Sequence, residues 1–99
     1  MARLFRDLLA GGIVSPQASV EMLELLTKQQ VNDRLPALLP TGARVAHKTG
    51  NLPGLVHDVG VIDTPGGPAV VAVLTEGVDD REATEFIALL GILVYYATP

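Results

Sequence analysis

The fold of this 99-residue chain is decided by residues 43–75, which read ARVAHKTGNLPGLVHDVGVIDTPGGPAVVAVLT. Three short runs in this stretch, residues 43–49, 56–63 and 69–75, are separated by turns that contain Gly and Pro, and the last run is rich in β-branched side chains. Such runs are typical of strands joined into an antiparallel meander. The last run, AVVAVLT, is apolar without interruption, so we expect it to be covered on both faces.

Helical patterns lie on either side of the predicted sheet. Residues 2–10 place four apolar side chains on one helical face, and a Gly-Gly pair ends that helix. Ser15 and Pro16 start a second helix that runs to about residue 30, because Ser is a favoured N-cap and Pro fits the first helical position. A third helix, residues 80–97, begins at a capping-box pattern that starts at Asp79. The sequence therefore predicts an α+β fold with two N-terminal helices, a three-stranded antiparallel meander and a C-terminal helix.

The last predicted helix is apolar on more than one side. After Glu85, several of its faces carry apolar residues, namely Ile87, Leu89, Leu90, Leu93, Val94 and Tyr95. A helix of this kind is buried on several sides, whereas three strands cover only one of them. We therefore expect another surface to cover the remainder.

Composition and charge exclude several classes of function. The net charge is −4, there are only two Phe, two Tyr and no Trp, and the seven Lys and Arg residues are scattered, which argues against nucleic-acid binding. The chain has no cysteine, and therefore no disulfide and no thiolate metal site. The most apolar run, residues 86–97, is too short to span a membrane. Residues 1–7 do not resemble a signal peptide.

The segment His47-Lys48-Thr49-Gly50 carries the candidate chemistry. It places an ammonium and a hydroxyl at the end of a predicted strand, next to a glycine that lets a ligand approach the backbone. Lys48 and Thr49 suit a carboxylate, and the backbone N–H of Asn51 could stabilise a developing oxyanion. Taken alone, the letters Lys-Thr-Gly also fit a strand that ends in a turn, with Lys48 solvated.

The wider context resembles one enzyme family. Lys-Thr-Gly belongs, with Ser-x-x-Lys and Ser-Asp-Asn, to the signature of class A β-lactamases and penicillin-binding proteins. Residues 45–77 are similar to that family's C-terminal sheet in the order of motif strand, short turn, His-Asp pair, Pro-Gly turn and hydrophobic strand. The helices of residues 8–30 and the final apolar helix also resemble the last third of the family's domain. The resemblance implies a β-lactamase-like fold, of which residues 1–99 form a single partial domain.

The resemblance implies substrate-binding roles for four residues. Lys48 and Thr49 match the residues that hold the substrate carboxylate, and Gly50 keeps the strand edge open. Asn51 falls where the family places an oxyanion-hole N–H, although Ser or Ala is more usual there. Asp58 matches an acidic residue that is structural in the family.

No catalytic residue of the family occurs in residues 1–99. Ser15 and Ser19 are the only serines; the residues three positions later, Ala18 and Met22, are not lysine, and Ser-Asp-Asn is absent. Acyl transfer needs an activated nucleophile and a base, which the family places upstream of this segment. We therefore expect residues 1–99 to supply the carboxylate- and oxyanion-binding side of the cleft of a serine hydrolase linked to antibiotic resistance. Without the rest of the domain, the segment is expected to be inactive. Whether its activity is β-lactam hydrolysis or of the D-Ala-D-Ala carboxypeptidase type stays open.

Other combinations of residues are weaker candidates. The chain order of a triad of Ser15 or Ser19 with a histidine and Asp58 fits no nucleophile elbow. Capping explains Ser15, and solvent exposure explains Ser19. His47 and His57 lack a metal-ligand spacing, so neither a metal nor a cofactor is predicted. The ring of His47 points away from the face of the lysine that follows it, where a packed histidine is expected.

A second class of function stays open, a non-catalytic folding or interaction module. Such a module would bury the apolar final helix against a second copy or a separately made N-terminal fragment. The predicted partners are thus a β-lactam or peptide-like carboxylate, once an N-terminal part completes the cleft, and a homo-oligomer or complementing fragment. Members of the resembled family are usually periplasmic or secreted, but nothing in residues 1–99 fixes the compartment.

Overall fold

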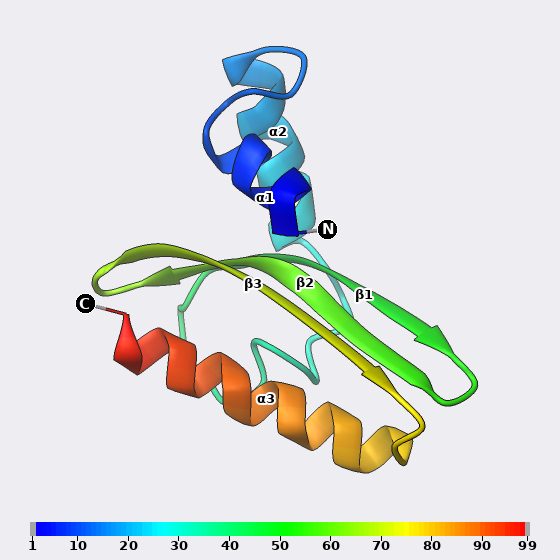
Figure 1. Ribbon diagram of the computed structural model, residues 1–99. Helices are drawn as coiled ribbons and strands as arrows, with labels where there is room; N and C mark the ends of the chain where they lie inside the picture. The colour runs from blue at the N-terminus through cyan, green and yellow to red at the C-terminus, as the bar shows by residue number, and fades with distance from the viewer. Residues whose placement is uncertain (1, 99) are drawn as a thin grey trace.

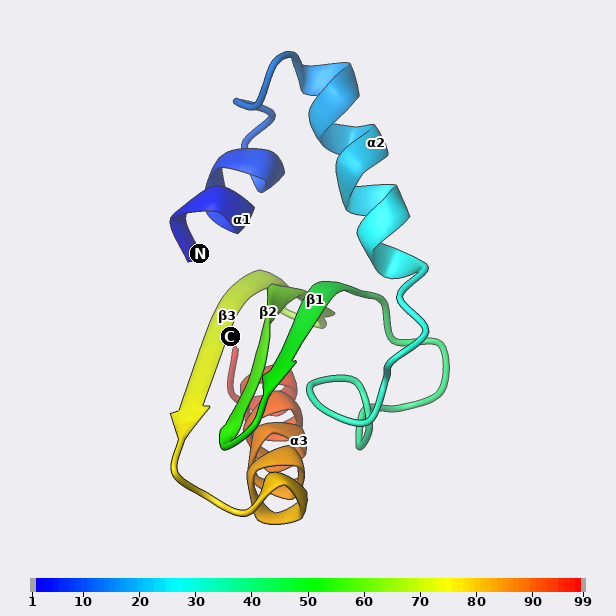
Figure 2. The ribbon, with the colours of Figure 1, turned by 90° about the vertical axis from the view of Figure 1, so that its right-hand side faces the viewer.

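The computed structural model describes residues 2–98 and has the α+β architecture that the sequence predicts. Its elements follow in the order α1 (Ala2–Leu9), α2 (Pro16–Thr27), β1 (Val45–Leu52), β2 (Leu55–Thr64), β3 (Gly67–Glu76) and α3 (Asp80–Ala97). The strands form one antiparallel sheet in the order β1-β2-β3. The helix α3 lies on one face of this sheet, and α1 and α2 lie on the other (Figure 1 and Figure 2). The predicted fold class is confirmed.

The hairpin between β1 and β2 is tighter than predicted. Pairing continues to Leu52, opposite Leu55, and leaves only Pro53 and Gly54 in the turn. Pro at the first turn position and Gly54 with a φ of 76° at the second are the combination that a type II turn uses. The Lys-Thr-Gly motif therefore lies inside β1, which corrects the prediction of a strand that ends with residue 49.

The buried strand of the sheet is β2 rather than β3. Residues 58–62 of β2 are all buried, whereas Val73 is the one buried residue of β3. The expectation that residues 69–75 are covered on both faces is therefore wrong. A three-stranded sheet has a single central strand, and the order β1-β2-β3 gives that place to β2 and an edge to β3.

The larger core lies between α3 and the sheet. Its buried members come from both elements and from the segment before β1: Leu35, Val45, Val56, Ile62, Val73, Ala83 and Ile87. Gly91 of α3 approaches that segment so closely that a Cβ at this position would clash with the carbonyl of Leu35. The segment is thus held against α3 by backbone contact, and a larger residue at position 91 would force it away.

A smaller core lies under α1 and α2, where the buried residues are Phe5, Val59 and Val61. Ser15 caps α2 as predicted, since its Oγ accepts the N–H of Ala18 at 3.0 Å. Ser19, predicted to be exposed, is instead fully buried. Its Oγ donates to the carbonyl of Ile13 at 2.9 Å and accepts the N–H of Ile13 at 3.1 Å. This hydroxyl therefore ties the turn after α1 to the body of α2.

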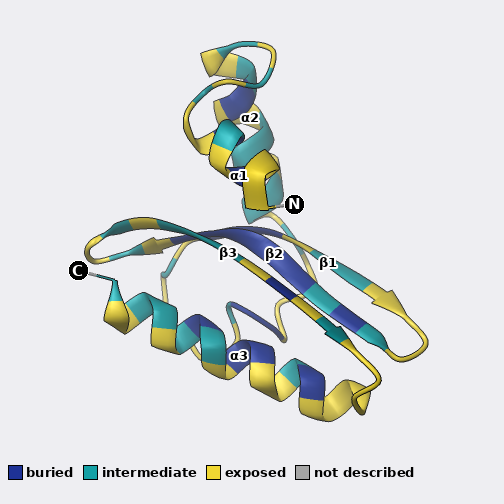
Figure 3. Ribbon diagram, in the orientation of Figure 1, coloured by how far each residue is buried: buried dark blue, intermediate teal, exposed yellow. Residues whose placement is uncertain are grey.

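The outward side of α3 is exposed and apolar (Figure 3). Phe86, Leu89, Leu93 and Tyr96, called the outer stripe below, are each more than half exposed. Residues at this spacing lie along one side of a helix. The prediction that α3 is apolar on more sides than the sheet covers is confirmed.

Candidate functional site

The free edge of β1 is the surface at which the four predicted binding residues lie. No strand within residues 2–98 pairs with this edge. The N–H of Asp63 donates to the carbonyl of Arg44 at 3.0 Å, so in the observed register the even-numbered residues of β1 direct their backbone groups toward β2. Thr49 and Asn51 consequently direct their backbone N–H and C=O groups outward. The N–H of Asn51 thus has the orientation that an oxyanion-binding donor needs.

The side chains of the motif divide between the two faces of the sheet. Lys48 and Gly50 lie on the face of α1 and α2, and Thr49 and Asn51 lie on the face of α3, because successive residues of a strand alternate. The Nζ atom of Lys48 nevertheless donates to the carbonyl of Thr49 at 2.7 Å. Since that carbonyl points outward, the ammonium group lies at the free edge. Lys48 and Asn51 are exposed, whereas Thr49 and Gly50 are partly buried.

Arg34 is a residue of this edge that the sequence analysis missed. Its side chain is only 4% exposed, and its Nη2 donates to Oδ1 of Asn51. Within residues 2–98 its Nε and Nη1 have no hydrogen-bond partner. Nη1 lies 3.5 Å from the carboxylate of Asp33, which is close enough for an ion pair but lacks hydrogen-bond geometry. A buried guanidinium with unfilled donors is costly, and Nε and Nη1 of Arg34 are both buried, so within residues 2–98 this arginine is an incompletely satisfied cation beside the motif strand.

A buried polar network fixes the segment that carries Arg34. His47 and Asp58 are buried, and Nδ1 of His47 lies 2.8 Å and 3.0 Å from the two carboxylate oxygens of Asp58. Oδ2 of Asp58 also accepts the N–H of Leu35 at 3.1 Å. Nε2 of His47 lies 3.0 Å from Oδ1 of Asn32. Residues on both sides of Arg34 are thereby tied to the sheet, and His47 and Asp58 have the structural roles expected of them.

The alternative chemical sites do not come together. The hydroxyls of Ser15 and Ser19 are bonded to the backbone of the α1–α2 region, whereas His47 is bonded to Asp58 and Asn32. In the described part of the chain, no group of three His, Cys, Asp or Glu residues is arranged to hold a metal ion. No helix within residues 2–98 has both the length and the apolarity needed to cross a membrane.

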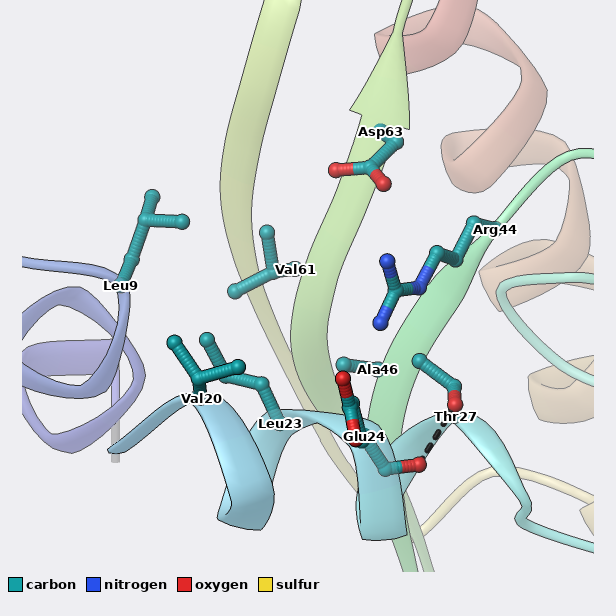
Figure 4. Close-up of a pocket in the computed structure, with 9 residues that line it drawn as sticks. All are labelled: Leu9, Val20, Leu23, Glu24, Thr27, Arg44, Ala46, Val61 and Asp63. Carbon is teal, nitrogen blue, oxygen red and sulfur yellow. Dashed lines mark hydrogen bonds between the residues drawn. The ribbon is translucent and has the colours of Figure 1, made fainter. Parts of the chain in front are cut away.

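A hollow of about 280 Å³ lies between α2 and the sheet, away from the motif (Figure 4). Its lining mixes apolar and charged side chains: Leu9, Val20, Leu23, Glu24, Thr27, Arg44, Ala46, Val61 and Asp63. The hydroxyl of Thr27 donates to the carbonyl of Glu24 at 2.6 Å, so it is no free nucleophile. A second hollow, of about 520 Å³, lies beside Phe86 and Val78. Neither contains the motif, and the candidate site is therefore an open edge rather than an enclosed pocket.

The fold is part of an α+β domain whose candidate site lies at the free edge of β1. A family model described as the Beta-lactamase enzyme family matches residues 1–98. The chain belongs to the β-lactamase enzyme family.

Solved structures with the same fold include a β-lactamase from Sphaerobacter thermophilus, PBP-A and the TLA-1 extended-spectrum β-lactamase. Their sequence identities to this chain are 38%, 34% and 26%, and their TM-scores are 0.91, 0.82 and 0.82. They cover 98%, 97% and 99% of this chain, but this chain covers only 38%, 37% and 40% of theirs. A variant of PBP-A has been solved as an acyl-enzyme complex with penicillin G. No match was found among curated proteins.

Proposed function

We propose that residues 1–99 supply the carboxylate-binding and oxyanion side of a β-lactamase-like cleft, and that they hydrolyse nothing alone. Lys48, Thr49 and Arg34 orient an anionic amide substrate, and the N–H of Asn51 polarises the carbonyl under attack. The reaction to which this side contributes is acylation of a serine by the amide carbonyl, followed by hydrolysis of the acyl-enzyme. The serine and its base come from a part of the fold outside residues 1–99.

The observation that carries this proposal is the buried guanidinium of Arg34 beside the motif strand. Its Nε and Nη1 lack hydrogen-bond partners within residues 2–98, while Nη2 is bonded to Asn51. A guanidinium presents paired donors that match the two oxygens of a carboxylate, and a nearby lysine adds a point charge. Within residues 2–98, Asp33 is the one acid that forms an ion pair with Arg34, and its side chain is 61% exposed. Two cations thus favour an anion at the edge of β1.

The claim of inactivity rests on the absent nucleophile. Neither serine is followed by lysine three positions later, and both hydroxyls are bonded to backbone groups within the helical region. Nucleophilic catalysis requires a hydroxyl beside a base, which neither serine has. Purified residues 1–99 should therefore not turn over a chromogenic β-lactam. Turnover that disappears on Ser15→Ala or Ser19→Ala would overturn this proposal.

A chimera tests the positive part of the proposal. Residues 1–99 would replace the matching 38% of the Sphaerobacter β-lactamase, which supplies the rest of the fold. We expect this chimera to be acylated by penicillin G, and Arg34→Ala to raise KM by about tenfold or more through loss of a charge-assisted bond. Arg44→Ala, a change at an exposed arginine away from the motif, is the matched control. An active chimera whose KM is the same with and without the Arg34 side chain would refute the role of Arg34.

The exposed outer stripe favours a second candidate function, the non-catalytic module. Four large apolar side chains on one side of α3 are available to a second copy or to a separate N-terminal fragment. The same feature is expected of an incomplete enzyme domain. Folding of the chain alone separates the two functions: cooperative unfolding of residues 1–99 without an N-terminal part would place the module ahead of the incomplete enzyme.

A further inference from the structure

The outer stripe of α3 has a spacing that is the same from both of its ends. Phe86, Leu89, Leu93 and Tyr96 follow one another at intervals of three, four and three positions. Such intervals are those of the two apolar positions of a heptad, which together form a narrow seam for one other helix. The four side chains are between 53% and 67% exposed, so the elements within residues 2–98 leave this seam uncovered (Figure 3).

This symmetry of spacing matches the requirement for pairing with a second copy of the same helix. In a dimer with a twofold axis, the same surface of both copies must be complementary to itself. When two copies of α3 lie antiparallel with the axis at the middle of the stripe, each Phe86 lies opposite Tyr96 of the partner subunit. Each Leu89 then lies opposite Leu93 of the partner subunit. Every member of the stripe is therefore matched by an apolar or aromatic side chain, a match that an unrelated partner would not require.

The distribution of charge on α3 favours the antiparallel direction. The charged residues of this helix, Asp80, Arg81, Glu82 and Glu85, all lie near its N-terminal end, and residues 86–97 carry no charge. A parallel pair of helices would place the acidic ends of both copies side by side, which like charges oppose. An antiparallel pair places each acidic end beside the uncharged end of the other helix.

The hollow of about 520 Å³ lies where this pairing needs space. It is lined by Phe86 itself, together with Val78 and Ala83. Because the antiparallel pairing sets Tyr96 of the partner subunit opposite Phe86, the second aromatic ring lies beside this hollow. Two aromatic rings in contact contribute more than their buried area alone. The hollow thus gives the bulkiest pair of the stripe room to pack.

We propose that the outer stripe is the interface of a homodimer in which two copies of α3 pack antiparallel about a twofold axis between Leu89 and Leu93. Four side chains from each copy make a small interface, so the dissociation constant of residues 1–99 is about 10 μM rather than nanomolar. This inference rests on the second candidate function, association of the chain with a partner. It does not require a substrate at the edge of β1.

Disulfide cross-linking tests the pairing, since the chain has no cysteine of its own. Leu89→Cys and Leu93→Cys would be purified separately and then mixed in a buffer of reduced and oxidised glutathione. The pairing brings position 89 of one copy beside position 93 of the other, whereas identical positions are displaced by roughly 6 Å along the helices. We expect the disulfide between unlike variants to exceed that between identical variants by about tenfold or more, because distant thiols cannot bridge. A parallel pair would give the opposite preference and would overturn the inference.

Leu25→Cys, mixed with Leu93→Cys, is the matched control. Leu25 lies on α2 and is 67% exposed, so random collision would cross-link it as readily as Leu89. Equal cross-linking at positions 25 and 89 would refute the α3 interface. The replaced side chains are more than half exposed, and urea unfolding of each variant verifies that the fold is kept.

Sedimentation velocity of the parent chain and activity of the chimera distinguish the ways in which the proposals can fail. Residues 1–99 that stay monomeric well above 10 μM would refute both the dimer and self-association in general. The stripe would then belong to a separate N-terminal fragment. A dimer that cross-links without the expected preference would refute only the antiparallel pairing. An inactive chimera would count against the proposed function and leave the result of the cross-linking unchanged.

Discussion

The free edge of β1 and the outer stripe of α3 are both left uncovered by residues 2–98, but they are built differently. At the edge, polar groups are fixed by buried partners: Asp58 and His47 hold the segment around Arg34, and Arg34 bonds to Asn51. Three members of the outer stripe, Phe86, Leu89 and Leu93, carry no polar group, and the fourth, Tyr96, carries a single hydroxyl. A pre-positioned set of donors suits a small ligand with defined geometry, whereas an apolar stripe suits another protein surface. The two surfaces therefore predict different consequences of substitution.

The largest effect on stability is expected at Asp58, whose buried carboxylate holds the segment that carries Arg34. Its fully buried carboxylate accepts from the N–H of Leu35 and lies within hydrogen-bond distance of His47. Asp58→Ala leaves the N–H of Leu35 and Nδ1 of His47 buried without their partner, so we expect the free energy of unfolding to fall by about 3 kcal/mol. Urea denaturation of the chimera measures this change.

A matched control lies on the same strand. Asp63 is exposed, and Asp63→Ala should change the free energy of unfolding by less than about 0.5 kcal/mol. If the two variants had equal stability, the buried network would not be what holds the segment around Arg34. The difference between the edge and the outer stripe would then lie in their surface chemistry alone.

A smaller effect, on binding rather than folding, is expected at Lys48. Lys48→Ala removes a charged donor from the edge, which costs about 1.5–3 kcal/mol in affinity for an anionic β-lactam. Lys48→Arg should also lose affinity, because a forked guanidinium does not replace a point charge in a fitted site. Both are measured as KM or dissociation constants in the chimera. Lys28→Ala, at the only other lysine, should leave affinity unchanged, and an equal loss there would indicate a non-specific charge effect.

The order of the elements could be predicted from sequence because local signals mark it. Ser15 and Pro16 mark the start of a helix, because Ser caps a helix with its side chain and Pro fits the first helical position, and glycine and proline mark the turns between the strands. The burial of β3 was predicted wrongly because burial depends on which strand is central in the sheet, and an apolar run in the sequence does not show which strands pair with it. The burial of Ser19 was also not predicted, because it depends on contacts with Ile13, which lies in the turn before the helix.

The candidate site was predicted only where a contiguous motif marks it. Lys48 to Asn51 are adjacent in the chain, whereas Arg34 reaches Asn51 across 17 positions. An arginine within VNDRLPALLP, residues 31–40, has no periodicity or motif that distinguishes it from a solvated loop residue. Its burial depends on two contacts of the flanking residues, those of Asn32 with His47 and of Leu35 with Asp58. Contacts between distant segments of this kind require the fold to be known first.

The smallest effect on stability, and the sharpest test of the outer stripe, is expected at Leu93. We expect the chain of residues 1–99 to associate at micromolar concentration, and Leu93→Glu to weaken that association by about tenfold or more, because burying a charge without a partner opposes contact. Since Leu93 is 63% exposed, its replacement should change the free energy of unfolding by no more than about 0.5 kcal/mol. Leu25→Glu is the control, at a leucine of α2 that is 67% exposed and lies outside the stripe. Sedimentation velocity separates the cases: if Leu25→Glu weakens association as much as Leu93→Glu, the contact is not made through α3, and if the parent chain is a folded monomer, the stripe needs no partner.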